Sequence, residues 1–293
     1  MESKKGTFFH ELSDGYPSFY IWLVLQKNIF RSITSPFRLL PNFIIFGSSR
    51  SGTRSLTKYL NQHPSIKMAS RKEVHFFNKT DNFNQGPNWY KSFFPTATTK
   101  KLFESKKNTK LICGEATPDY IYNPKVPERI LKLIPKIKLI AVLRNPIDRA
   151  YSHYHHMVRS NREELSFEDA IRIEPERIAS DIKNNKFDGK NYFHYSYLRR
   201  GIYHSQLKTW MNVFDKNQFL ILESKQLENN LEKTLDAVFK FLELPKFEIL
   251  DAGKINVGNY PDMKPKTRKF LEEYFKPHNE ELEKFLNQKF SWT

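Results

Sequence analysis

The segment at 42–60 constrains the fold more than any other part of the sequence. It begins with the apolar run "FIIF" at 43–46 and continues with the loop "GSSRSGT" at 47–53. Apolar residues at helical spacing follow and end at "NQHP". A short apolar run bounded by glycine predicts a buried strand, and the spacing after the loop predicts an amphipathic helix. This succession is the first unit of an α/β sheet.

The same alternation recurs later in the chain. Further buried strands are predicted at 111–113, 138–143 and 219–223, and helical patterns follow the last two at 147–159 and 228–243. Short continuous apolar strands that alternate with helices indicate a parallel sheet covered on both faces. Ligands of such sheets bind at the carboxyl ends of the strands.

The chain ends in a further helical pattern. Residues 265–288 predict a closing amphipathic helix that is interrupted near Pro277, because proline lacks a backbone N–H. We see no internal repeat and no low-complexity linker. We therefore expect one domain at 41–293, preceded by an accessory segment at 1–40, with an α/β three-layer fold in which helices flank a central parallel sheet.

Charge and cysteine content narrow the partners and the compartment. The 293 residues carry 48 Lys and Arg against 32 Asp and Glu, a formal net charge of +16. This charge favours polyanions without choosing among nucleic acid, anionic lipid, phosphorylated cofactors and acidic glycans. Cys113 is the only cysteine, which excludes an internal disulfide and favours a reducing compartment.

The accessory segment contains the nearest candidate for a membrane span. Its apolar run "FYIWLVL" at 19–25 is too short to cross a bilayer, and no signal-peptide pattern is present, so a cytoplasmic location is expected. Phe19, Trp22 and Leu23 stand near Lys27, a pattern that fits either packing on the domain or peripheral contact with a membrane surface.

The loop at 47–53 resembles a phosphate-binding loop that lacks one residue. A Walker A loop has a lysine after its second glycine, whereas Thr53 follows Gly52 here. The N-terminus of the following helix offers free N–H groups and the positive end of the helix dipole, which suit a phosphate or a sulfate. Arg50 and Arg54 add positive charge, so we expect a P-loop-like fold without the Walker lysine.

The strand at 138–143 argues against a magnesium-dependent NTPase. Such enzymes usually end a neighbouring strand in an aspartate that helps to hold the metal, but Arg144 follows this strand. An arginine there repels a metal and attracts an anion, and Ser152 can donate its hydroxyl to the same group. The alternative is that Arg144 forms an ion pair with Asp148 at the start of the helix.

A third segment, "SRKEVHFFN" at 70–78, places a carboxylate among cations and aromatic residues. Glu73 stands beside Lys72 and near His75, and it could act as a general base. The alternatives are that Glu73 forms a salt bridge in a basic loop and that His75 is a structural histidine.

Several segments agree, in order, with one known family. These are "FGSSRSGTRSL" at 46–56, "KEVHFF" at 72–77, "TPDYIYNPKVPERI" at 117–130, "LRNPIDRAYSHY" at 143–154 and the closing stretch at 275–292. Through them the chain resembles the sulfotransferases that use 3′-phosphoadenosine 5′-phosphosulfate (PAPS). The resemblance is to the carbohydrate type, related to heparan sulfate sulfotransferases and their bacterial relatives.

The resemblance implies a role for each matched residue. The loop would bind the 5′-phosphosulfate, and Arg144 and Ser152 would bind the 3′-phosphate of the nucleotide. The implied nucleotide-binding residues are Ser49, Arg50, Ser51, Gly52, Thr53, Arg54, Arg144 and Ser152. The implied catalytic residues are Glu73 as the base, Arg50 as a stabiliser of the leaving phosphate, and Lys72 and His75 as residues that shape the base and the cleft.

The resemblance also indicates where the acceptor binds and where this chain departs from the family. Lys125 and His156 would contact the acceptor. Arg50 replaces a lysine that is usual in the family, although tyrosylprotein sulfotransferases look similar here, and Asn78 replaces a frequent aspartate. In the late loop at 255–265, the candidates for closing over the nucleotide are Asn256, Gly258 and Lys264.

The predicted function is sulfuryl transfer from PAPS to a hydroxyl of a carbohydrate or glycolipid, with 3′-phosphoadenosine 5′-phosphate (PAP) as product. Neither a metal nor a nucleic-acid partner is expected. Two alternatives stay open. A P-loop kinase of a small metabolite is disfavoured by the missing lysine and aspartate, and a non-enzymatic polyanion-binding protein is suggested by the net charge of +16.

Overall fold

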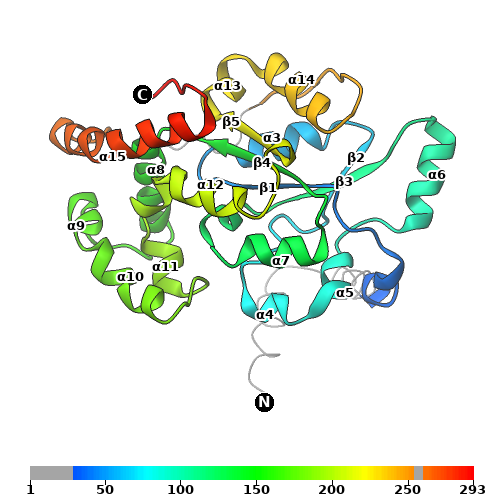
Figure 1. The fold of residues 1–293 in the computed structure, drawn as a ribbon, viewed down its shortest axis with the longest axis horizontal. Helices are drawn as coiled ribbons and strands as arrows, with labels where there is room; N and C mark the ends of the chain where they lie inside the picture. The colour runs from blue at the N-terminus through cyan, green and yellow to red at the C-terminus, as the bar shows by residue number, and fades with distance from the viewer. Residues whose placement is uncertain (1–28, 254–259) are drawn as a thin grey trace, which may run out of the picture.

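A five-stranded parallel sheet forms the centre of the computed structural model, which describes residues 29–253 and 260–293 (Figure 1). The strand order is β2-β3-β1-β4-β5, and all four neighbouring pairs are parallel. Strand β1 therefore lies in the middle, between β3 and β4. The strands are β1 (Phe43–Gly47), β2 (Ile66–Met68), β3 (Ile112–Ala116), β4 (Lys138–Leu143) and β5 (Phe219–Glu223).

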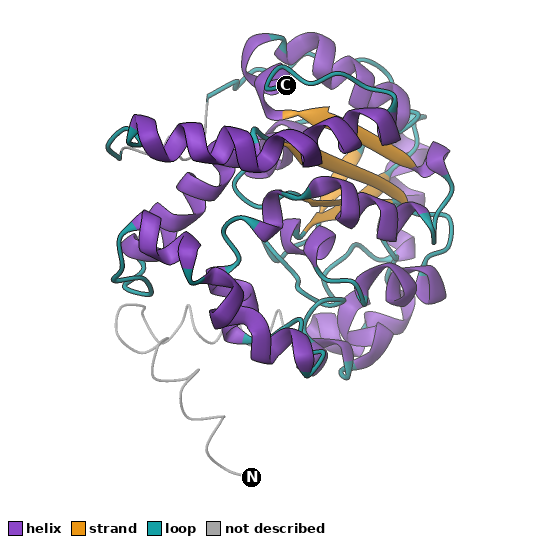
Figure 2. Cartoon of the chain, turned by 60° about the vertical axis from the view of Figure 1, so that its left-hand side comes forward, coloured by secondary structure: helices purple, strands orange, loops and turns teal. Residues whose placement is uncertain are grey.

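Helices cover both faces of the sheet (Figures 1 and 2). On one face lie α3 (Thr53–Leu60) and α14 (Leu231–Phe241), and on the other lie α7 (Val126–Leu133) and α12 (Tyr203–Met211). The predicted three-layer α/β fold with a parallel sheet is confirmed.

The two layers pack on β1 because its side chains alternate between the faces. Ile44 and Phe46 belong to the apolar cluster that contains residues of α7 and α12, whereas Phe43 and Ile45 belong to the cluster with α3 and α14. All five residues of the strand are buried. A strand covered on both sides needs an apolar residue at nearly every position, as "FIIF" provides.

Other helices extend this core to the side. α8 (Pro146–Arg159), α9 (Phe167–Arg172) and α15 (Pro265–Leu286) pack around a third apolar cluster. The described chain also contains α4 (Thr80–Phe83), α5 (Gly86–Lys91), α6 (Ala97–Lys107), α10 (Glu174–Lys183), α11 (Lys190–Tyr195) and α13 (Ser224–Asn229). Its 3-10 helices are η1 (Ser35–Phe37), η2 (Pro118–Tyr122), η3 (Arg199–Gly201) and η4 (Lys216–Gln218).

Three details of the predicted elements were wrong. Strand β2 was missed, because its three residues include the exposed Lys67 and give no continuous apolar run. The strand predicted at 111–113 extends to Ala116. The helix predicted at 228–243 is two helices, α13 and α14, because Asn230 leaves the helical region with φ −139° and ψ 51°.

The predicted interruption near Pro277 was also wrong, since α15 continues through this proline. Leu271, Phe275 and Leu282 lie on one face of the helix and are buried. A proline removes one hydrogen bond of the helix. The packing of this apolar face keeps the two halves of α15 together.

The described part of the accessory segment packs against the domain. Arg31 and Arg38 donate hydrogen bonds to the backbone carbonyls of Ser92 and Phe94, at 3.0 and 2.6 Å. Phe19, Trp22, Leu23 and Lys27, named above for membrane contact, lie outside the described residues. Within the described ranges, no helix is both long and apolar enough to cross a membrane.

Candidate active site

A cavity of about 630 Å³ lies at the edge of the sheet where the strands end. Its lining includes residues that directly follow β1, β3, β4 and β5, among them Ser49, Pro118, Arg144 and Ser224. Parallel sheets bind ligands at this edge, beside the strand where the connections change direction. The cavity is therefore in the place that the sequence pattern predicted for a ligand.

Two glycines shape the loop between β1 and α3. A Cβ atom on Gly47 would lie 2.7 Å from atoms of Ile121, and Gly52 has a left-handed φ of 89°. In the described chain no side chain caps the N-terminus of α3, which begins at Thr53. Its first N–H groups have no partner within the helix and are available to an anion. All the predicted loop residues line the cavity: Ser49, Arg50, Ser51, Gly52, Thr53 and Arg54.

Arg50 connects this loop to the segment that follows β4. Its Nε donates to the Oγ of Ser152 at 3.3 Å, and its carbonyl oxygen accepts from the guanidinium of Arg144 at 3.2 Å. Burial lowers the pKa of Arg50, and Arg159 and other nearby arginines lower it further. A desolvated cation among other cations is stabilised by a bound anion, so this end of the cavity fits a phosphorylated ligand.

Arg144 is not paired with Asp148, so the alternative prediction of an Arg144–Asp148 ion pair at the start of the helix is wrong. Asp148 instead pairs with Arg268 of α15 at 2.9 Å. Arg144 and Ser152 both line the cavity, as predicted for a second phosphate site. The helix α8 that carries Ser152 is capped by Asn145, whose side chain accepts from the N–H of Ile147.

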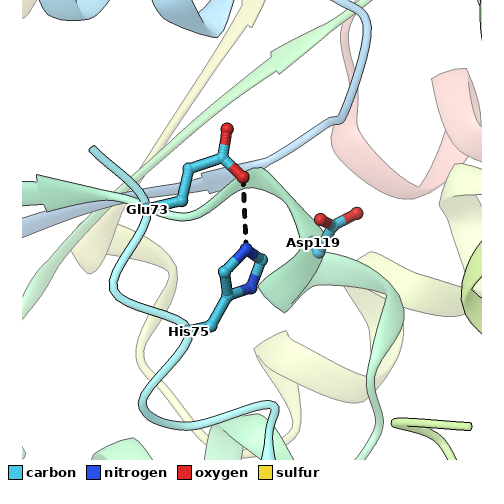
Figure 3. A group of neighbouring side chains, drawn as sticks. All are labelled: Glu73, His75 and Asp119. Atoms are coloured by element: carbon cyan, nitrogen blue, oxygen red, sulfur yellow. Dashed lines mark ion pairs between the residues drawn. The ribbon is translucent and has the colours of Figure 1, made fainter. Parts of the chain in front are cut away.

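Glu73 and His75 also line the cavity and lie beside each other (Figure 3). The Nε2 of His75 lies 3.3 Å from a carboxylate oxygen of Glu73, and its Nδ1 lies 3.3 Å from the amide oxygen of Asn78. Arg54 lies 3.9 Å from the other oxygen of Glu73. The Glu73 side chain keeps 27% of its surface exposed. It is therefore oriented by its neighbours and still open to a ligand.

Asp119, which the sequence analysis did not single out, completes a group of three. Figure 3 shows its carboxylate beside the Glu73–His75 pair, and ligand atoms of the three residues lie within 4.8 Å of one another. Burial would raise the pKa of Asp119, but the nearby positive groups, Arg200 first among them, together lower it. Since Arg200 already compensates Asp119 and Arg54 faces Glu73, the local charges disfavour a divalent cation.

Two histidines of α8 also belong to the cavity lining. His156, which was predicted to contact the acceptor, lines the cavity, and so does His153, which the sequence analysis missed. Burial lowers the pKa of His156, and Arg50 and Arg159 lower it further. Burial also holds the pKa of His153 well below its usual value. Both rings are therefore neutral at pH 7 and can interact with a ligand through hydrogen bonds but not through charge.

Two predicted residues do not reach the cavity. Lys72 is exposed and is not part of the lining, although Glu73 beside it is. The ammonium of Lys125 donates to the carbonyl of Asn185 at 2.7 Å and lies over the ring of Phe187. The structure therefore gives neither lysine the contact that was predicted for it.

The cavity also contains cations and aromatic residues that carried no local signal in the sequence. They come from separate segments that only the fold brings together. The missed lining residues include Lys79, Asp119, His153, Arg162, Phe193, Arg200 and Tyr260.

The late loop is only partly described. Asn256 and Gly258 lie outside the described residues. Lys264 precedes α15, is not part of the cavity lining, and forms an ion pair with Glu168 at 3.2 Å. Among the residues of this loop that the structure describes, Tyr260 lines the cavity.

Fold and site together define a class of protein: an α/β transferase whose phosphate-binding loop lacks the Walker lysine. The model of the sulfotransferase domain matches residues 40–286. The chain therefore belongs to the sulfotransferase family, as the resemblance predicted.

Individual relatives agree with this assignment. Over 284 residues the chain is 32% identical to the human bifunctional heparan sulfate N-deacetylase/N-sulfotransferase 3, in a match that covers 85% of this chain and 30% of the relative. It is 28% identical to the membrane-associated sulfotransferase kil1 of Dictyostelium discoideum, with 91% and 69% covered. The chain thus spans less than a third of the human relative's length.

Solved structures show the same fold. A sulfotransferase from Alicyclobacillus acidocaldarius is 29% identical and superimposes with a TM-score of 0.66, covering 86% of this chain and 98% of that one. The mouse sulfotransferase SULT7A1, solved in complex with PAP, has a TM-score of 0.50 and 14% identity, with 88% and 91% covered. The second likeness supports the fold alone.

Proposed function

We propose that this protein transfers a sulfuryl group from PAPS to a hydroxyl of a carbohydrate or glycolipid acceptor. One observation carries the proposal: the same cavity is lined by the residues 49–54, Arg144 and Ser152, which we call the nucleotide side, and by Glu73 and its neighbours, which we call the base side. Such a cavity can hold a doubly phosphorylated nucleotide and an acceptor together.

The nucleotide side fits PAPS and its product PAP in charge and in donor groups. The free N–H groups at the start of α3 and the side chains of Arg50 and Arg54 would bind the 5′-phosphosulfate. Arg144 and Ser152 would bind the 3′-phosphate. The depressed pKa of the half-buried Arg50 guanidinium supports this assignment, because an anion there would offset its partial desolvation.

In the proposed reaction the donor supplies the sulfuryl group, and the residues of this chain supply the base and the charge stabilisation. Glu73 accepts the proton of the acceptor hydroxyl as the oxygen forms its bond to sulfur. Arg50 and the N–H groups of the loop stabilise the negative charge left on the phosphate when its bond to sulfur breaks. His75 orients Glu73 through the contact at 3.3 Å, and His156 is placed beside the acceptor.

A carbohydrate acceptor is proposed from the relatives. The human relative is named for heparan sulfate and for N-sulfotransfer, so an amine-bearing polysaccharide belongs among the acceptors to be tested. Lys125, predicted to contact the acceptor, has no part in this proposal, since the carbonyl of Asn185 binds its ammonium.

An acceptor screen with labelled PAPS tests the function. The panel contains N-deacetylated heparan polysaccharide, a neutral glycolipid and a small alcohol, each with and without EDTA. We expect labelled product that EDTA leaves unchanged. The absence of transfer together with tight, magnesium-dependent ATP binding would support the kinase instead. Salt-sensitive binding to DNA or heparin without turnover would support the polyanion-binding protein.

Peripheral membrane contact of residues 1–40 is a further part of the proposal. Four large apolar side chains of its described part are exposed, by 53 to 74%: Ile29, Phe30, Ile33 and Phe37. The Dictyostelium relative is named as membrane-associated. We expect the full chain to sediment with vesicles of anionic lipid and Phe37→Ser to sediment less. Equal recovery of both proteins in the supernatant would refute the contact.

A further inference from the structure

A buried carboxyl group lies behind the loop that carries Glu73, and the proposed reaction does not use it. Glu115, in β3, has no exposed surface. Its Oε1 accepts from the hydroxyl of Tyr90 at 2.7 Å, and its Oε2 accepts from the hydroxyl of Thr117 at 3.2 Å. Burial raises the pKa of Glu115 to about 7, while hydrogen bonds from Tyr90, Tyr120 and Thr117 oppose the rise. A carboxyl group with no solvent contact cannot touch the acceptor substrate. Glu115 can therefore affect the reaction only through its neighbours.

Two of these neighbours contact the backbone of the Glu73 loop. The Oγ1 of Thr117 accepts from the N–H groups of Val74 and His75, at 3.2 and 3.4 Å. The hydroxyl of Tyr120 accepts from the next two N–H groups, those of residues 76 and 77, at 3.0 and 3.4 Å. Four successive N–H groups that follow Glu73 therefore donate to two hydroxyl oxygens.

The direction of these hydrogen bonds depends on Glu115. A hydroxyl group has one hydrogen and two lone pairs. Because Thr117 donates its hydrogen to the carboxylate, its lone pairs are free to face the loop. Tyr120 also interacts with Glu115, and this interaction lowers the pKa of the carboxyl. Without a hydrogen-bond acceptor at residue 115, each hydroxyl hydrogen would be free to turn toward the loop. It would then point at the loop N–H groups and weaken their hydrogen bonds to the hydroxyl oxygen.

The loop needs such support because its backbone is unusual. His75 has a φ of 54°, in the left-handed region that side chains other than glycine rarely adopt. The carbonyls on this stretch are bound as well, since the side chain of Asn82 donates to those of Val74 and His75, at 3.3 and 3.0 Å. The conformation that directs Glu73 and His75 at each other is thus fixed from behind.

We propose that Glu115 is a positioning residue, which fixes the Glu73 loop through the hydroxyls of Thr117 and Tyr120. The inference rests on the proposed role of Glu73 as the base. Glu115 itself touches neither donor nor acceptor.

The test compares variants of Thr117 and Glu115 in the full chain. Thr117→Val keeps the shape and removes the hydroxyl, whereas Thr117→Ser keeps the hydroxyl. Glu115→Gln replaces an acceptor with an amide that also donates. For Thr117→Val and Glu115→Gln we expect kcat to fall by about 10-fold to 100-fold, the range for a misplacement of about 1 Å. The acceptor KM and the PAP affinity should stay within about threefold, and Thr117→Ser should retain most of the wild-type kcat.

Tyr90→Phe is the matched control. Tyr90 donates to the same carboxylate but contacts none of the four loop N–H groups through its hydroxyl. We expect Tyr90→Phe to lower the Tm as Thr117→Val does, while its kcat stays near the wild-type value. Equal losses of kcat in Tyr90→Phe and Thr117→Val, or a normal kcat in Thr117→Val, would overturn the positioning role.

Amide hydrogen exchange gives a readout that needs no acceptor. With PAP bound, the amides of residues 74–77 should exchange at least about tenfold faster in Thr117→Val and Glu115→Gln than in the wild type or Thr117→Ser. Unchanged amide exchange in Thr117→Val would refute the proposal. If Glu115→Gln does not fold, the result for Thr117→Val alone tests the proposal. A wild type without sulfuryl transfer would refute the proposed function, while the exchange data would still test the network.

Discussion

The two sides of the cavity are built in different ways. The proposed nucleotide side comes from two short stretches that follow the neighbouring strands β1 and β4, and Arg50 connects them through Ser152 and Arg144. The base side combines Glu73 from one loop with Asp119 from η2 and residues of later helices. Each half of the first side is one short stretch directly after a strand, whereas the second side is assembled from several loops and helices.

The difference follows from what each side must do. A phosphate or sulfate is bound by N–H groups and positive charge, which one loop and one helix N-terminus can supply. A general base must instead be directed at one proton, so its position has to be fixed by surrounding groups. In this chain the buried hydroxyls of Thr117 and Tyr120 accept hydrogen bonds from the Glu73 loop, as the proposed positioning of the base requires.

Replacement of Glu73 tests the base side and has the largest expected effect. Glu73→Gln keeps the size of the side chain but cannot accept the proton, so turnover should fall about 10²-fold or more. The affinity for PAP should change little, because Arg50 and Arg144 remain. Transfer from labelled PAPS and calorimetric titration of PAP measure the two quantities.

An exposed carboxylate outside the cavity lining gives the control for this prediction. Glu164→Gln removes a similar charge near the end of α8 and should leave both quantities unchanged. Near-normal turnover in a folded Glu73→Gln protein would remove Glu73 from the role of base.

Replacement of Arg144 tests the nucleotide side with a smaller expected effect. A charge-assisted arginine contact contributes about 1.5–3 kcal/mol, so Arg144→Ala should weaken PAP binding by roughly 10-fold to 100-fold. Binding of adenosine 5′-phosphosulfate, which lacks the 3′-phosphate, should barely change. Calorimetric titrations of both nucleotides against both proteins measure the difference.

The control is Arg172→Ala, which removes an exposed guanidinium that pairs with Asp169 on α9. It should leave both affinities unchanged. Equal losses of both nucleotides in Arg144→Ala would contradict the 3′-phosphate assignment.

Two lysines on either side of Glu73 give the smallest expected effect. Lys79 lines the cavity and Lys72 does not, although both are exposed. Exposed charged contacts contribute about 0.2–1 kcal/mol, so Lys79→Ala should raise the acceptor KM by at most about fivefold. Lys72→Ala should leave KM unchanged, as steady-state kinetics with the best acceptor can show. A larger effect of Lys72→Ala would mean that the loop presents its other side to the acceptor.

The nucleotide side was predictable from the sequence because its signals are local. An apolar strand, two glycines and a helix start stand next to one another, so Gly52 and Arg50 could be placed before the structure was known. Arg144 was also identified, as the residue directly after a buried strand. The sequence left open whether Arg144 pairs with Asp148. In the structure Asp148 pairs instead with Arg268, which lies more than a hundred residues away in the chain.

The base side was only partly predictable. Glu73 and His75 were named from one motif, but Lys72 in the same motif faces away from the cavity. The direction of a side chain in a loop depends on tertiary hydrogen bonds, here those of Thr117 and Tyr120, which local pattern does not encode. Asp119 and its partner Arg200 were missed because they are 81 positions apart.

The sequence alone therefore determined the layered parallel sheet, the anion-binding loop and the family, because apolar periodicity and adjacent motif residues are local properties. Tertiary structure alone decided which cations reach the cavity, how Asp148 is paired and which hydroxyls bind the backbone of the Glu73 loop. The physical reason is that burial, hydrogen-bond direction and charge compensation depend on groups that folding brings together from distant positions.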